Sequence, residues 1–253
     1  MTYKDEKDIQ AFKKVNTDSW DTVQDDIFVR LLNTKCIDKY GDDIAHTKVM
    51  DLSMAFAVNE VMGETFVSHM LTNQEIEKYG VDLETVKKKA VLNSTHDRRK
   101  RIVSFKESIL RTNPMYPLLR VPDMPMMMGS SQQNSGILED VDEEGNPNLL
   151  MVMNTTNVFG ASYAFLPSVL DELYERFDYS NFYLLPLSVH SILCVKSSYA
   201  TKNGEKPIRE AEDDLLDLVL HMNDHNNKSW KDILSYRIYY FIGDDGKVII
   251  PIK

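Results

Sequence analysis

The sequence predicts an α+β fold, mainly an antiparallel sheet with helices packed on it. Three observations predict it: short apolar runs bounded by turn residues, amphipathic helical segments between those runs, and a hairpin signal near the end of the chain, Gly-Asp-Asp-Gly at 243–246. The chain has 253 residues, 43% of them hydrophobic, which is enough for a substantial core. We expect either one compact unit or two tightly joined, similar lobes.

Changes in composition divide the chain into four predicted segments. They are an N-terminal helical segment, a first α+β lobe, a Pro- and Met-rich connection and a second α+β lobe, at residues 1–26, 27–97, 98–148 and 149–253. In the connection, four prolines and the acidic run at 139–144 argue against a continuous element.

Helix and strand signals then follow in order through the first half. Two short helices are expected over 6–15 and from Thr17 or Asp18 onward. Strands are predicted over 28–33, 49–58 and 66–71. We expect Asn73 to cap a helix that ends at Gly80, and Asp82 to cap the next helix.

The second half shows the same two kinds of pattern. Strands are predicted over 149–154, 161–165, 182–185, 191–195, 233–242 and 248–252. Helices are predicted over 168–177 and 208–223, and in the second of these Leu215, Val219 and Met222 fall on the buried stripe.

Charge and cysteine content exclude several classes of protein. The 39 acidic and 29 basic residues give a formal net charge of −10, which opposes binding to nucleic acid and to anionic membranes. Cys36 and Cys194 are far apart in apolar surroundings, so we expect no disulfide and a cytoplasmic location. No apolar run approaches the roughly 20 residues that span a bilayer, and the first residues carry no secretory signal.

Candidate catalytic residues are few. His46 and Asp51 bracket the entry to a strand, and they would form an acid/base cluster if they faced one cleft with His190. No GxSxG turn and no phosphate-binding loop is present, so a hydrogen-bonded core histidine is the favoured interpretation of His190.

A metal site is suggested only weakly. His221 and His225 are four residues apart at a helix end, a spacing that lets two imidazoles share a metal. Met222 stands where the HExxH arrangement needs glutamate, so two histidines at a solvated helix end are the favoured interpretation. No cofactor is expected.

Two groups in the connection are candidates for binding. One is the basic group Arg98, Arg99 and Arg101, which could meet a phosphate or an acidic partner, or form a solvated face. The other is the methionine group, which could form an adaptable contact surface or fill the core under a loop. Its members are Met124, Met126, Met127 and Met128.

Several short motifs, taken in order, resemble an uncharacterised family. The match covers roughly residues 27–240, and its motifs are Ala45-His46, Asp51-Leu52, Leu71-Thr72-Asn73, Tyr79-Gly80-Val81, Asn154, Gly160-Ala161, Leu166-Pro167, Leu185-Pro186-Leu187-Ser188-Val189-His190 and Met222-Asn223. The family is one of unknown function, common in gut-dwelling anaerobic Gram-positive bacteria and their mobile elements. Ser191 stands where this family usually has an acidic residue, and Ala45 where it has a proline. The resemblance implies an origin and no reaction.

The expected function is noncatalytic binding of another macromolecule, with a host or defence protein as the expected partner, in a mobile-element or phage setting. The acidic composition, the Met- and Pro-rich connection and the lack of a complete catalytic signature favour it. The alternative is a hydrolase, with or without a metal, that uses His46, Asp51 and His190 in one cleft. A third interpretation is that acidic stripes mimic nucleic acid and occupy a basic partner. The sequence does not predict the oligomeric state.

Overall fold

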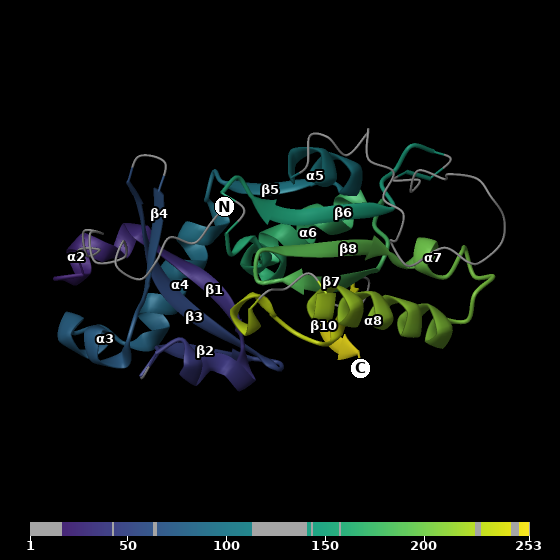
Figure 1. Cartoon of the computed structure of the whole chain (residues 1–253). Helices are drawn as coiled ribbons and strands as arrows, with labels where there is room; N and C mark the ends of the chain where they lie inside the picture. Colours follow the sequence, from purple (N-terminus) through teal and green to yellow (C-terminus); the bar gives the residue numbers. More distant parts are fainter. Residues whose placement is uncertain are drawn as a thin grey trace.

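The fold is that of a computed structural model that describes residues 17–41, 43–62, 65–112, 141–142, 144–156, 158–225, 229–243 and 248–252. It confirms the predicted α+β class, because two antiparallel sheets are covered by helices. Figure 1 shows the two sheets side by side, with the early part of the chain in one half and the later part in the other.

The first sheet is built around one long strand. Its strands are β1 (Ile27–Asn33), β2 (His46–Val49), β3 (Leu52–Met62) and β4 (Thr65–Met70). β3 pairs with β1 along one side, and with β2 and then β4 along the other. The single strand predicted over 49–58 is wrong at its start, since the chain turns at Met50 with a φ of 56° before β3 begins.

Helical segments flank the first sheet. They are α2 (Trp20–Val23), η1 (Gln24–Asp26), η2 (Thr34–Lys39), α3 (Asn73–Tyr79) and α4 (Leu83–Thr95). The cap of α3 is Thr72 and not the predicted Asn73: the Thr72 hydroxyl accepts from the Glu75 N–H, and the Glu75 carboxylate accepts from the Thr72 N–H. Gly80 ends α3 with a φ of 69°, and Asp82 caps α4, both as predicted.

The second sheet has six strands. Their spatial order is β10-β9-β7-β8-β6-β5, and their bounds are β5 (Lys100–Ser104), β6 (Leu149–Asn154), β7 (Phe182–Ser188), β8 (Ser191–Lys196), β9 (Ile238–Ile242) and β10 (Val248–Ile252). β5 falls inside the predicted connection, and α5 (Phe105–Thr112) follows it. Buried Ile102 and Val103 explain this difference, because they add an apolar edge to the sheet opposite β6.

The remaining elements pack on the second sheet. They are η4 (Gly160–Phe165), α6 (Pro167–Arg176), α7 (Ser197–Ala200), α8 (Ile208–His225) and η5 (Trp230–Asp232). The strand predicted over 161–165 is wrong, because this segment is the 3-10 helix η4. All six η4 residues are buried, so this segment lacks the alternation of apolar and polar residues that would distinguish a strand from a helix. A Cβ on Gly160 would lie 2.6 Å from the backbone of Asn154 and of His190, so only glycine fits at the start of η4.

One continuous core joins the two sheets. Its largest cluster includes Val29 and Phe56 of the first sheet, Val86 of α4 and Val152 of the second sheet. The opposite face of the second sheet is covered by α8, whose Leu215, Leu218 and Val219 are buried there as the helical period predicts. The two halves are therefore not separated by solvent at this interface.

The outer edge of β1 is closed by side chains instead of by another strand. The Val29 N–H donates to the Ser94 hydroxyl at 2.9 Å, and the Leu31 N–H donates to the Ser162 hydroxyl at 2.8 Å. The Asn93 amide donates to the Ile27 carbonyl at 2.9 Å. Because Ser162 belongs to η4, this edge also ties the first sheet to the second half of the chain.

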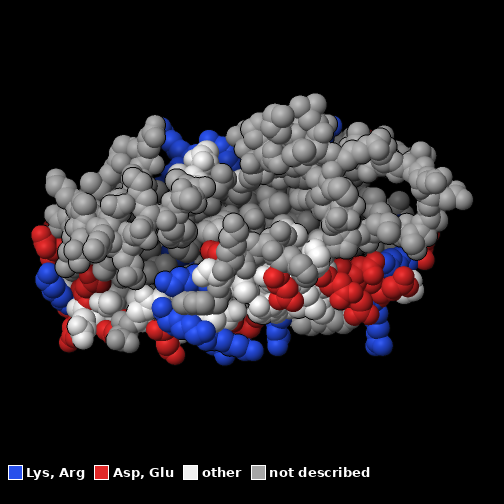
Figure 2. All heavy atoms as spheres, in the orientation of Figure 1, with Lys and Arg blue, Asp and Glu red and all other residues white. Residues whose placement is uncertain are grey.

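Acidic side chains gather along α8. Figure 2 shows them together on one face of the molecule, and Glu210, Asp213 and Asp217 are exposed there. Lys206 at the start of α8 makes ion pairs with Glu210 and Asp214. Among the residues described, none of the helices combines the length and the apolar composition that crossing a bilayer demands.

Candidate functional site

An open cleft lies where α4 ends and the chain turns into β5. It has a volume of about 570 Å³. Its lining comes from η1, β1, β3, α4 and the turn before β5, and consists of Asp25, Asp26, Phe28, Asn59, Asn93, His96, Asp97, Arg98 and Arg99. Most of these side chains are polar, although the cleft borders the main core.

Alternation along β1 explains why polar groups collect here. Ile27, Val29 and Leu31 face the core, so Phe28 and Arg30 project from the opposite face of the same strand. The residues paired with Phe28 and Arg30 on β3 are Ala57 and Ala55. These small side chains leave room on this face for a guanidinium and an aromatic ring.

Arg30 is a fully buried cation on this face, with 1% of its surface exposed. Its Nη1 donates to the Val29 carbonyl at 3.0 Å, and its Nη2 donates to Asn59 Oδ1 at 2.7 Å. The guanidinium carbon lies 4.9 Å from the centre of the Phe159 ring, in cation–π contact. Burial lowers the pKa of Arg30 to about 10, so the side chain is still charged at neutral pH.

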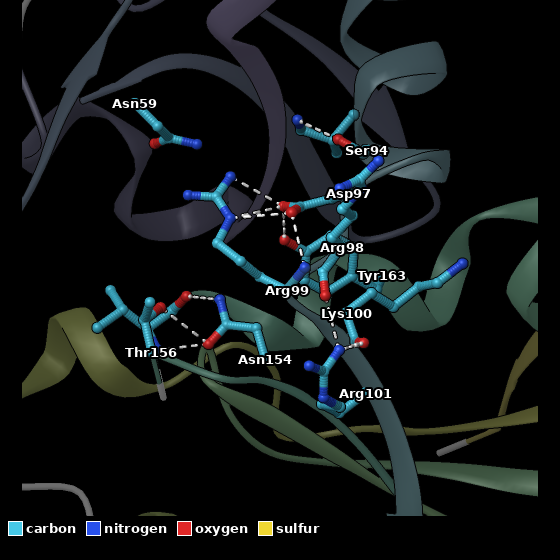
Figure 3. Close-up of polar contacts among 12 residues, drawn as sticks. Asn59, Ser94, Asp97, Arg98, Arg99, Lys100, Arg101, Asn154, Thr156 and Tyr163 are labelled. Carbon is cyan, nitrogen blue, oxygen red and sulfur yellow. Dashed lines mark hydrogen bonds and ion pairs between the residues drawn. The ribbon is translucent and has the colours of Figure 1, made fainter. Parts of the chain in front are cut away.

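Asp97 is the buried carboxylate of the cleft, with its side chain 5% exposed. Arg99 binds it with two nitrogens: Nε donates to Oδ1 at 2.9 Å, and Nη2 donates to Oδ2 at 2.9 Å. The Tyr163 hydroxyl donates to the same carboxylate. Figure 3 shows the Arg99 guanidinium beside Asp97, with Asn59 beyond it.

These bonds determine the charge state of Asp97. Burial alone would raise its pKa, but the hydrogen bonds from Arg99 and Tyr163 outweigh burial and hold the pKa below its ordinary value. The pKa of Tyr163 is raised, first by burial and then by its bond to Asp97. Asp97 is therefore an ionised carboxylate engaged by Arg99 and Tyr163, and this arrangement gives the cleft a rigid floor.

His190 contacts Phe159, the residue whose ring packs against Arg30. Its Nδ1 accepts from the Phe159 N–H at 3.1 Å, so Nε2 carries the proton and faces Asp232 Oδ1 at 3.4 Å. Phe159 has a φ of 57°, and its ring contacts both Arg30 and the His190 ring. His190 thus holds the aromatic residue that packs against the buried arginine.

The stabilising role of His190 is expected to disappear in mild acid. Burial lowers the pKa of His190 despite Asp232, so the unfolded chain takes up a proton first and folding stability falls as pH drops below about 6.5. Protonation also removes the Nδ1 lone pair that accepts from Phe159. We predict that His190→Ala lowers the free energy of unfolding by about 1–3 kcal/mol at pH 7.5, and by less at pH 5.5.

Urea unfolding of wild type and variant at both pH values measures this. His46→Ala, at an exposed position, serves as the matched control and should change the free energy of unfolding by less than about 0.5 kcal/mol. An equal loss at both pH values would contradict the proposed protonation.

The predicted trio of His46, Asp51 and His190 makes three separate sets of bonds. His46 is exposed on β2, and its Nδ1 bonds the Ile44 carbonyl at 2.8 Å. Asp51, at the turn before β3, accepts from the Tyr239 hydroxyl at 3.0 Å and from the Ser235 hydroxyl at 3.2 Å. Asp51 and His190 contact different residues of the segment 232–239: Asp51 bonds Tyr239, and His190 faces Asp232. No hydrogen bond or ion pair joins any two of the trio within the part of the chain described.

The other predicted sites fall in different places. His221 lies half-buried on α8, whereas the side chain of His225 is outside the described residues. Across the described ranges, no group of three or more His, Cys, Asp or Glu side chains is arranged to hold a metal. The methionine group at Met124, Met126, Met127 and Met128 also lies outside the described residues.

Of the three predicted arginines, two line the cleft. Arg98 is exposed at its rim, and Arg99 forms part of its floor together with the Phe28 ring, 4.8 Å from the guanidinium carbon. Arg101 lies half-buried beyond the cleft and donates to the carbonyls of Arg98 and Lys100.

None of the predicted motifs includes Arg30, Asn59, Asp97 or Tyr163. A signal for the first was present, since Arg30 interrupts the otherwise apolar run Ile27–Leu32, and a charge in a core strand needs buried partners. Nothing local marks Asn59, because Arg30 reaches it only across the sheet pairing of β1 with β3.

Comparison with known proteins identifies a family but no individual relative. No curated protein and no solved structure matches the chain. The model of a family described as "Family of unknown function (DUF5688)" matches residues 1–242. This match takes in every described residue of the cleft, and the chain belongs to that family.

Proposed function

We propose that the protein binds another protein without catalysing a reaction, and that the cleft at the end of α4 is where it does so. One observation carries the proposal. The buried carboxylate of the cleft, Asp97, is engaged by Arg99 and Tyr163, which supports a preorganised binding surface over a site that uses Asp97 as a base.

The size and lining of the cleft suit a side chain or short segment of a partner. Pockets of roughly 300–1,000 Å³ accommodate compact ligands, and the cleft is open. Arginines and aromatic rings dominate the energetics of protein interfaces, and here the exposed Arg98 and the half-buried Phe28 line the same cleft. Asp26 adds an exposed carboxylate to the lining, whereas Asp25 already forms an ion pair with Lys89 at 2.6 Å.

The overall charge favours a protein partner over nucleic acid. The formal net charge is −10, and exposed acidic residues on α8 extend this charge over one face. We further propose that the partner is a host or defence protein and that this chain is encoded by a mobile element. This part of the proposal rests on the resemblance of the sequence motifs to the family.

Site-directed photocrosslinking tests the proposal. We expect His96→p-benzoylphenylalanine, at the exposed edge of the cleft, to crosslink a distinct protein in cells that encode this chain. The same probe in place of Tyr179, which is 64% exposed outside the cleft, is the matched control and should give at most a tenth of that yield. Excess wild-type protein should compete.

Equal yields at the two positions, or crosslinks to this chain alone, would rule out the cleft as a partner site. Mass spectrometry of peptides from the crosslinked band shows whether it contains another protein or a second copy of this chain.

A further inference from the structure

The Asn59 side chain is held in one orientation. Its Oδ1 accepts from Arg30 Nη2 at 2.7 Å and from the Ser68 hydroxyl at 3.0 Å. Because a guanidinium only donates hydrogen bonds, the carboxamide oxygen must face Arg30, and the amide nitrogen lies on the other side of the group. In Figure 3 this nitrogen is turned towards Asp97 and Arg99, which line the same cleft as Asn59.

The amide nitrogen of Asn59 is a buried donor. Asn59 is 5% exposed, and among the residues that the structure describes its Nδ2 has no hydrogen-bond partner. Asn93 lines the same cleft and differs in this respect, since its Nδ2 donates to the carbonyls of Gln24 and Ile27 at 2.8 and 2.9 Å. Native proteins rarely retain an unsatisfied buried donor, so we expect an acceptor that enters the cleft from outside to bind Asn59.

The bond from Arg30 decides which kind of acceptor suits Asn59. Arg30 is charged at neutral pH, and its guanidinium donates directly to the oxygen of the same amide. This bond draws electron density from the amide and makes its N–H groups more polar. A positive charge one hydrogen bond away also favours an anionic oxygen over a neutral one, and it disfavours a cation.

The charges that line the cleft are compatible with an anion. Two of the three lining carboxylates already have a cation, in the pairs Asp25–Lys89 at 2.6 Å and Asp97–Arg99 at 2.9 Å. The other two lining charges, Asp26 and Arg98, are exposed and opposite in sign. The net charge of −10 on the whole chain is screened beyond about 8 Å at physiological salt, so the groups nearest to the amide decide.

We propose that Asn59 Nδ2 donates to the carboxylate of a glutamate or aspartate side chain of the partner, and that Arg98 attracts this carboxylate. The inference rests on the function proposed above. A side chain fits because Asn59 is recessed, and a narrow methylene tether can reach it while the partner's backbone stays outside. A phosphate fits less well, because its second negative charge would meet Asp26 and Asp97.

Titration of the ¹⁵N-labelled full chain with capped amino acids tests the preference for an anion. The probes are N-acetyl-glutamate α-methylamide and its neutral isostere N-acetyl-glutamine α-methylamide. The readout is the side-chain NH₂ resonances of Asn59 and Asn93. We expect the glutamate probe to shift the Asn59 resonances saturably, and at least fivefold more than those of Asn93. The glutamine probe should bind at least fivefold more weakly.

Two further probes identify the source of the anion. N-acetylalanine carries only a terminal carboxylate, and inorganic phosphate carries a higher charge on a tetrahedral group. At equal ionic strength, each should bind at least threefold more weakly than the glutamate probe.

Three variants separate the donor from its surroundings. Asn59→Asp keeps acceptor oxygens for Arg30 and Ser68 but has no N–H, so affinity for the glutamate probe should fall at least tenfold. Arg98→Gln, at an exposed position, should lower affinity two- to fivefold and weaken its dependence on salt. Arg209→Gln, exposed on α8, is the matched control and should leave affinity unchanged. Thermal unfolding of each variant confirms that it is folded.

Four results would overturn the inference: unshifted Asn59 resonances in wild type, equal or tighter binding of the glutamine probe, tighter binding of N-acetylalanine or phosphate, or unchanged affinity in Asn59→Asp. Each leaves the proposed function standing if the crosslink from position 96 is still formed. Loss of that crosslink, with the Asn59 resonances still responsive to the glutamate probe, would instead reject a protein partner.

Discussion

Arg30→Ala is expected to lower the free energy of unfolding by about 3 kcal/mol, because it removes charged hydrogen bonds to Val29 and Asn59 and leaves a cavity beside Phe159. For a chain of this length that loss corresponds to a fall in Tm of roughly 6–12 °C. Relief of the desolvation of a buried charge opposes the loss but does not offset it, since Arg30 also fills the space over Ala55.

Denaturant unfolding and calorimetry measure this effect. Arg30→Lys keeps the charge without the forked donors, and should fall between wild type and Arg30→Ala. Arg209→Ala, at an exposed position on α8, is the matched control and should change stability by less than about 0.5 kcal/mol. A loss below about 1 kcal/mol for Arg30→Ala would show that the buried guanidinium does not organise this face of the sheet.

Asp97→Asn is expected to cost about 2 kcal/mol at neutral pH, because Arg99 and Tyr163 both lose a carboxylate partner. Arg99 is 22% exposed, so water screens part of the loss. The pH dependence has a definite sign. The folded pKa of Asp97 is below its ordinary value of 3.8, so its contribution is present above about pH 4 and disappears as pH falls through the folded pKa.

A double-mutant cycle isolates this interaction. Once Asp97→Asn is present, Arg99→Met should cost at least 1 kcal/mol less than it does in wild type. Additive losses, or unchanged acid unfolding in Asp97→Asn, would show that the two side chains act independently.

Much of the fold follows from local patterns. Apolar runs of the right length give β1, β6 and β8, and the helical period places Leu215 and Val219 on the buried face of α8. Capping residues mark where helices begin, although Thr72 and Asn73 both satisfy the pattern, and only the reciprocal bonds with Glu75 favour Thr72.

Failures occurred where tertiary packing overrides local pattern. In η4 every residue is buried, so a short apolar run fits a strand and a 3-10 helix equally well. The edge strand β5 begins in a basic run, and only its pairing with β6 makes it a strand.

Local sequence patterns also predict only part of the cleft. Arg98 and Arg99 were predicted as binding residues from their charge, and the structure places both of them in the cleft. Asn59 and Tyr163 are separated from them by tens of residues and meet them only in the folded chain. An asparagine gives no sign in sequence of whether its amide nitrogen is bonded, as in Asn93, or has no acceptor among the residues that the structure describes, as in Asn59.

The most direct test of noncatalytic binding uses the protein captured by crosslinking through position 96. The captured protein, once purified, is mixed with an equimolar amount of this chain, and its intact mass is measured before and after prolonged incubation. We expect a stable complex from which the partner is recovered with its mass unchanged. A change of mass that occurs with wild type, but not with His190→Ala or His46→Ala, would contradict the account and support a hydrolase.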